Sequence, residues 1–151
     1  MQVRSVGTLP FDGEPAFDEA IEHARKVGLD LASHRSCRIE GVDLSNADLV
    51  VGFEFNHMAK AVVDARADRR RTFLLPELVE YLEQAPSSRD DEVVARARRA
   101  VEAAAELRAQ RGPAPPAEIP DPAGRPPHEG MKTVEQIVAL TTRLARLLFP
   151  A

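Results

Sequence analysis

Asp121 is the residue of this sequence whose surroundings most favour a catalytic role. It stands in the run Ile-Pro-Asp-Pro-Ala-Gly at residues 119–124. The two prolines stiffen the backbone, because each ring fixes its own φ and restricts the residue before it. A carboxyl group held in this way suits a general acid over a cleft. Composition alone favours the simpler interpretation, an aspartate in a turn of a proline-rich loop.

Signatures of several other catalytic and nucleotide-binding sites are absent from the sequence. There is no Gly-x-Gly-x-x-Gly run, no Walker-type loop, no Gly-x-Ser-x-Gly and no His-Glu-x-x-His. Cys37 is the only cysteine, so this chain can form neither an internal disulfide nor a thiolate metal cluster. A cysteine phosphatase loop carries Arg six positions after its cysteine, but that position here is Asp43. We interpret Cys37 as a small residue in a polar loop.

The four histidines lack the spacing of metal ligands. We expect His23, His57 and His128 to be solvated surface residues. The sequence therefore predicts neither a metal site nor a cofactor.

The composition is that of an ordinary globular domain. Hydrophobic residues make up 44% and charged residues 29% of the 151, which is typical of one domain with a core. The net charge of −4 and the scattered Lys and Arg give no reason to expect a nucleic-acid partner. No apolar run approaches the roughly 20 residues that span a bilayer, and no signal peptide is recognisable. We expect a cytoplasmic protein without a membrane partner.

Short apolar strands alternate with amphipathic helices along the chain. The expected strands are residues 2–6, 49–53 and 72–75, the second of them buried on both faces. Helices are expected over 15–27, 57–65, from 76, from a capping signal at 88–91 to about 110, and from 133 onward. The proline-rich segment 113–127 is typical of a linker. This alternation predicts an α/β fold with a parallel sheet, although such sheets usually have about four to six strands.

Five segments, in this order and spacing, resemble the low-molecular-weight protein-tyrosine phosphatase family over essentially the whole chain. They are Ser-Val-Gly-Thr at 5–8, Gly-Leu-Asp-Leu-Ala-Ser-His-Arg-Ser at 28–36, Ala-Asp-Leu-Val-Val at 47–51, Thr-Phe-Leu-Leu-Pro-Glu-Leu at 72–78 and Asp-Pro at 121–122. The resemblance implies a three-layer α/β/α domain with a short parallel sheet of strand order 2-1-3-4.

The resemblance also implies that residues 1–151 form a single domain that is incomplete at its N-terminus. The family's first strand, its Cys-x-x-x-x-x-Arg-Ser loop and its first helix have no counterpart here. Met1 is then expected to be an internal start, and residues 2–6 to be the second strand. Without its central strand the domain is expected to be poorly stable, or residues 2–6 to shift into the vacant place.

By the same resemblance the family activity is hydrolysis of phosphate monoesters through a phosphocysteine intermediate, with a phosphoprotein or small phosphomonoester as substrate. Asp121 matches the general acid and base, and Ser5 matches a serine that supports the phosphate loop. His34 matches a histidine beside that loop, but is interpreted equally well as a hydrogen-bonded structural residue. Ala123 and Gly124 replace the aromatic residues that often follow the Asp-Pro pair, which weakens the case for phosphotyrosine.

Without the nucleophile, the chain is expected to be an inactive pseudoenzyme as it stands. One alternative is a non-catalytic binding module on a phosphatase scaffold. Another is arsenate reduction on the same fold, but its thioredoxin-coupled form needs cysteines in addition to Cys37.

Overall fold

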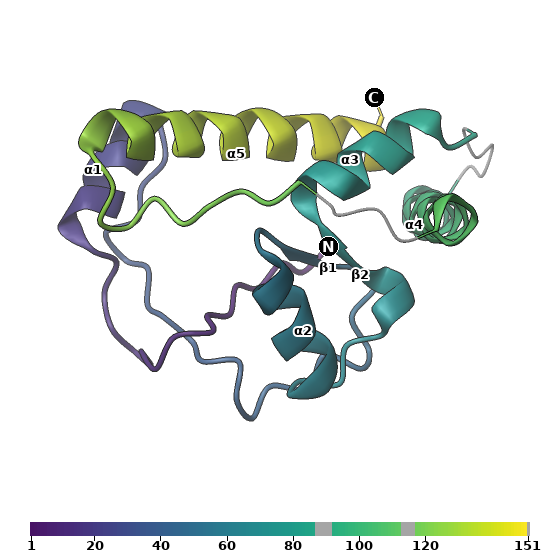
Figure 1. Ribbon diagram of the computed structural model, residues 1–151, viewed down its shortest axis with the longest axis horizontal. Helices are drawn as coiled ribbons and strands as arrows, with labels where there is room; N and C mark the ends of the chain where they lie inside the picture. Colours follow the sequence, from purple (N-terminus) through teal and green to yellow (C-terminus); the bar gives the residue numbers. More distant parts are fainter. Residues whose placement is uncertain (87–91, 113–116, 151) are drawn as a thin grey trace.

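Two short strands and five α-helices form the main regular structure of residues 1–86, 92–112 and 117–150, which the computed structural model describes (Figure 1). In chain order the elements are α1 (Asp18–Lys26), β1 (Val50–Gly52), α2 (Phe55–Val63), the 3-10 turn η1 (Arg69–Arg71), β2 (Thr72–Leu74), α3 (Leu75–Gln84), α4 (Val93–Arg111) and α5 (Pro127–Leu148). The expected capping signal at 88–91 and residues 113–116 of the proline-rich segment lie outside the described residues. The fold is a mixed α/β arrangement with a parallel sheet.

The sheet pairs the two strands that the apolar runs at 49–53 and 72–75 predicted. β1 and β2 are parallel, with Val51 opposite Phe73. β2 is buried throughout, whereas Val50 and Val51 are only half-buried. Within the described ranges no further strand extends the sheet. The expectation that the first of these strands is buried on both faces is confirmed only in part: Gly52 is buried, but Val50 and Val51 stay half-buried.

The prediction of a strand at residues 2–6 is wrong. The segment has no strand pairing, and it neither extends the sheet nor fills a central position in it. The neighbouring Gly7 instead forms an isolated parallel bridge with Arg38: its N–H donates to the Cys37 carbonyl at 2.7 Å and its carbonyl accepts from the Ile39 N–H at 2.9 Å. A β-prone run becomes a strand only where a neighbouring backbone supplies hydrogen-bond partners.

Two helices begin three or more residues away from the start that the sequence predicted. Pro15 does not open α1 but forms an isolated bridge with Arg35, and α1 begins at Asp18. α5 begins at Pro127, before the expected Thr133, with its proline in the first turn, where the missing N–H costs nothing. The proline-rich segment is therefore not a linker over its whole length, because its last residue already belongs to α5.

Side chains of β1 alternate between two apolar clusters, because successive residues of a strand point to opposite faces. Val50 packs against the cluster of Ile39, Ala61, Ala65 and Ala67. Val51 packs against the clusters built by α3, α4 and α5. In Figure 1, α2 lies below the two strands, and α3 and α5 lie above them. Helices therefore cover both faces of the sheet.

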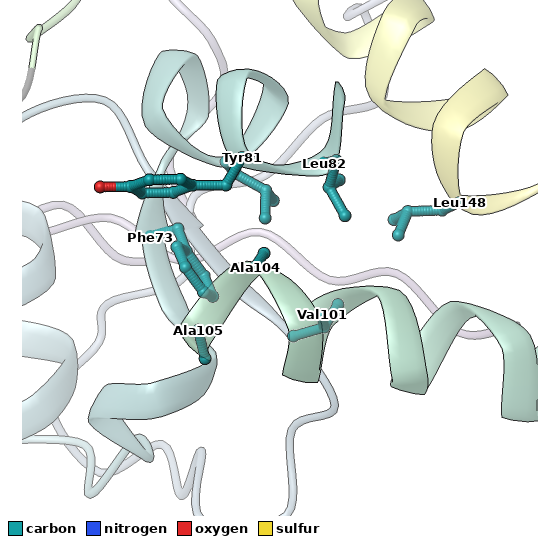
Figure 2. Close-up of a cluster of buried hydrophobic side chains, with 8 residues drawn as sticks. Phe73, Tyr81, Leu82, Val101, Ala104, Ala105 and Leu148 are labelled. Carbon is teal, nitrogen blue, oxygen red and sulfur yellow. The ribbon is translucent and has the colours of Figure 1, made fainter. Parts of the chain in front are cut away.

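The largest apolar cluster, called here the main core, is shown in Figure 2. It joins β2, α3, α4 and the end of α5, and Phe73 is fully buried within it. Its buried members are Phe73, Leu78, Tyr81, Leu82, Val101, Ala104, Ala105 and Leu148. The two alanines and the valine that α4 contributes are small, which allows this helix to approach the aromatic rings of Phe73 and Tyr81 closely.

Arg108 of α4 closes one side of the main core. Its guanidinium lies over the Phe73 ring, 4.0 Å from the centroid, and donates to the carbonyl oxygens of Thr72 at 2.7 Å and Arg69 at 2.6 Å. It also lies 3.8 Å from the Glu77 carboxylate, whose side chain is only 14% exposed. Burial lowers the pKa of Arg108, and burial raises the pKa of Glu77 despite the nearby guanidinium.

The Glu77→Gln variant is expected to gain stability relative to the wild type as pH rises from about 4.5, the ordinary pKa of this group. A raised pKa means that the folded state holds the Glu77 proton more tightly than the unfolded state does. The stability contribution of the protonated group is thus complete below the unfolded pKa and is lost as pH rises through the folded pKa. Urea unfolding of both proteins between pH 4 and pH 7 measures the difference.

Glu80→Gln is the matched control for this prediction. Glu80 is exposed on the same helix, and its hydrogen bond with Arg111 lowers its pKa. The glutamine variant should therefore lose relative stability as pH rises toward about 4.5, the opposite sign, and should change little above that pH. The prediction would be contradicted if the stability of Glu77→Gln relative to the wild type also fell as pH rises. Ionisation of the buried Glu77 carboxyl would then not destabilise the folded state.

His23 was expected on the surface, and this is wrong. The residue is 5% exposed where α1 packs on α5. Gly130 of α5 lies so close that a Cβ there would stand 2.9 Å from His23 Cε1. Position 23 is three after Ala20 and four before Val27, so it falls on the apolar face of α1. His57 is half-buried rather than solvated, whereas His128 is exposed as expected.

Candidate functional site

The Asp121 turn is fixed by its own backbone and side chain. Asp121 is exposed. Its Oδ1 accepts from the Ala123 N–H at 2.8 Å, and its carbonyl accepts from Arg125 Nε at 3.0 Å. The first of these is the Asx-turn hydrogen bond with which an aspartate imitates a backbone turn. The stiff turn that the prolines predicted therefore gains a hydrogen bond that orients the carboxylate.

A buried anchor holds this turn at the carboxyl end of β1. Ile119 is 1% exposed and packs with Leu75 and Val79 of α3. Its N–H donates to the carbonyl of Phe53, the residue after β1, at 2.8 Å. Residues that follow parallel strands lie at the sheet edge where α/β proteins usually bind ligands. Asp121 is thus located where a catalytic acid of such a fold is useful.

Two glutamates contact the Asp121 segment, and sequence reasoning missed both. Glu54 Oε1 accepts from the Asp121 N–H at 3.1 Å. Glu118 Oε1 accepts from the N–H of Phe55, the first residue of α2, at 2.5 Å. The only available signal was that Glu54 precedes a predicted helix, where acidic side chains favour the helix dipole. Nothing in the sequence linked either glutamate to a segment more than 60 residues away.

His57 supports the turn between β1 and α2. Its Nδ1 lies 3.4 Å from the Phe53 N–H nitrogen and 3.3 Å from that of Glu54, and accepts from both. Its Nε2 is 3.8 Å from Glu54 Oε2. A ring nitrogen that accepts hydrogen bonds carries no hydrogen, so the N–H of this ring is at Nε2, on the side of Glu54. His57 thus holds the backbone that carries Glu54.

The other two expected site residues, Ser5 and His34, are not brought to Asp121. Ser5 is exposed in the segment without strand pairing. His34 is half-buried in the loop between α1 and β1, where its N–H donates to the Leu31 carbonyl and its carbonyl accepts from Arg35. Across the described ranges neither residue shares a hydrogen bond or ion pair with Asp121.

Cys37 lies exposed in the same loop, as the sequence predicted. Its Sγ is 3.7 Å from the Arg38 carbonyl oxygen. Its own carbonyl accepts from the Gly7 N–H, so the residue contributes to the isolated bridge through its backbone.

A shallow cleft of about 270 Å³ lies at the opposite end of the sheet from Asp121. Asp48 and Arg71, which precede β1 and β2, line it together with Arg98, Val101 and Glu102 of α4. Arg98 donates to Asp48 at 2.8 Å, so part of the lining charge is already paired. Because the amino ends of parallel strands share one edge, this cleft is not part of the Asp121 site.

Among the described residues no group of three or more His, Cys, Asp or Glu side chains is arranged to hold a metal ion. In the same residues no helix is long and apolar enough to cross a membrane. The described residues form a small α/β fold in which the exposed, oriented carboxylate of Asp121 lies at the carboxyl end of the sheet. No family model, curated protein or solved structure matches the chain.

Proposed function

We propose that this chain is a phosphatase-type scaffold, similar to the low-molecular-weight protein-tyrosine phosphatases, that carries the acid and base of phosphate monoester hydrolysis but not its nucleophile. The observation that supports this most is the position of the Asp121 turn, anchored by Ile119 to the end of β1. A general acid for a leaving oxygen has to be exposed, rigid and close to a ligand-binding edge. The three-layer arrangement and the strand order 2-1-3-4 belong to this proposal, as do supporting roles for Ser5 and His34.

The proposed reaction divides into two steps. A cysteine thiolate attacks phosphorus, the P–O ester bond breaks, and Asp121 gives its proton to the leaving oxygen. Water then attacks the phosphocysteine, the S–P bond breaks, and Asp121 takes the proton from that water. The nucleophile and the arginine that binds the phosphate oxygens are absent from this chain, because position 43, six after Cys37, is Asp. The chain alone is therefore expected to be inactive.

A fusion protein tests the proposal. An added N-terminal segment would supply a strand, a Cys-x-x-x-x-x-Arg-Ser loop and a helix ahead of residue 1. We expect the folded fusion to hydrolyse phenyl phosphate and p-nitrophenyl phosphate, and the same fusion with serine in place of the added cysteine to be inactive. A fusion that folds cooperatively but shows no cysteine-dependent turnover would contradict the proposal.

A non-catalytic binding module remains the alternative, favoured by the lack of a nucleophile and by the separation of Ser5 and His34 from Asp121. The same experiment separates the two functions, since a binding module gives no turnover in the fusion. Turnover by the 151-residue chain without any added segment would contradict both functions.

A further inference from the structure

The Asp121 segment and the β1–α2 turn exchange hydrogen bonds in both directions. Glu54 belongs to the turn and accepts the Asp121 N–H. Glu118 belongs to the Asp121 segment and accepts the N–H of Phe55, the residue of α2 that directly follows the turn. Between them, the Ile119 N–H donates to the Phe53 carbonyl. We propose that Glu54 and Glu118 are positioning residues that together set the location of the Asp121 carboxylate.

The bond made by Glu118 also caps α2. Phe55 is the first residue of this helix, and its N–H is one of the four that have no partner within a helix. An anionic acceptor at this end is favoured by the helix dipole and makes a charge-assisted hydrogen bond. The hydrogen bond that attaches the Asp121 segment to α2 therefore also gives a partner to an N–H group at the start of this helix.

The bond made by Glu54 completes the set of contacts around Asp121. The backbone N–H of Asp121 is held by Glu54, its carbonyl by Arg125 and its Oδ1 by the Ala123 N–H. Within the described residues its Oδ2 accepts no hydrogen bond, so this oxygen is the one available to a substrate. Loss of Glu54 removes the only one of these contacts that comes from outside the residues 121–125.

The two contacts are expected to depend on each other. Ile119 lies between them, and its hydrogen bond to Phe53 requires the two segments to stay in register. Loss of the hydrogen bond that either glutamate accepts loosens that register and so displaces the Asp121 carboxylate from the end of β1. The consequence for catalysis rests on the proposed function, since a displacement of about 1 Å at a reacting group is costly. The hydrogen bonds themselves do not rest on it.

Amide hydrogen exchange measured by NMR on the 151-residue chain tests the positioning role directly. We expect Glu54→Ala to accelerate exchange of the Asp121 amide about tenfold, and Glu118→Ala to do the same at Phe55, as for the loss of one hydrogen bond. Each variant should also accelerate the Ile119 amide. Glu54→Gln and Glu118→Gln keep an acceptor oxygen and should restore much of the protection. Glu106→Gln, an exposed glutamate on α4, is the matched control and should leave all three rates unchanged.

Two results would overturn the inference. One is an Asp121 amide that exchanges at the wild-type rate in Glu54→Ala, or as fast in the glutamine variant as in the alanine variant. The other is an equal acceleration at Phe73 of β2, which would mean that the glutamates support the whole domain and not this segment. Neither result depends on phosphatase activity, so an inactive fusion protein and a failed positioning role are distinguishable.

Discussion

Replacing Asp121 with Asn in the fusion protein is expected to lower kcat for phenyl phosphate by about 10²–10⁴-fold, the usual contribution of general acid–base catalysis. Asparagine keeps an oxygen that can accept the Ala123 N–H, so the turn around position 121 is preserved while the transferable proton is lost. Steady-state kinetics of the two proteins measure the effect.

The leaving group provides a second readout of the same substitution. Phenolate is a poorer leaving group than p-nitrophenolate and depends more on protonation, so Asp121→Asn should slow phenyl phosphate more than p-nitrophenyl phosphate. Asp64→Asn, an exposed aspartate at the end of α2, is the control and should leave kcat unchanged. An equal and small effect of both asparagine variants would show that Asp121 is a turn residue only.

Phe73→Ala is expected to lower the free energy of unfolding by about 3–5 kcal/mol, the usual cost of deleting a fully buried ring. Phe73 is 0% exposed at the centre of the main core (Figure 2). The substitution leaves a cavity between β2, α3 and α4 and also removes the ring below the Arg108 guanidinium. Urea unfolding followed by circular dichroism measures the change.

Phe73→Leu provides a measurement if the alanine variant does not fold, with an expected loss of about 1–2 kcal/mol. Phe55→Ala is the matched control, because this ring is 61% exposed and its removal should cost less than about 0.5 kcal/mol. Similar losses for Phe73→Ala and Phe55→Ala would contradict the packing described for the main core.

Local rules predicted those elements that depend on residues close together in the chain. The apolar runs at 49–53 and 72–75 become β1 and β2, and Pro76 lies in the first turn of α3. Gly28 and Gly112 follow their helices with φ of +79° and +73°, a conformation that glycine adopts without a steric penalty. Each of these features follows from the allowed backbone angles or from the periodicity of a few residues.

The wrong predictions concern residues whose state depends on distant partners. Residues 2–6 have strand-like composition but no neighbouring strand in the described part of the chain. His23 has a polar ring, but the close approach of Gly130 on α5 buries it. In both cases the packing around the segment, and not its own composition, decided the outcome.

The candidate site divides in the same way. The sequence by itself determined a rigid turn at Asp121, because proline rings and an Asx turn act within a few residues. Only the tertiary structure decided that this turn lies at the carboxyl end of β1 and that Glu54 and Glu118 hold it there. Glu54 is 67 residues from Asp121, whose N–H it accepts, and Glu118 is 63 residues from Phe55, whose N–H it accepts. Contacts over such separations arise from the packing of Ile119 and α3 against the sheet, and no local pattern records them.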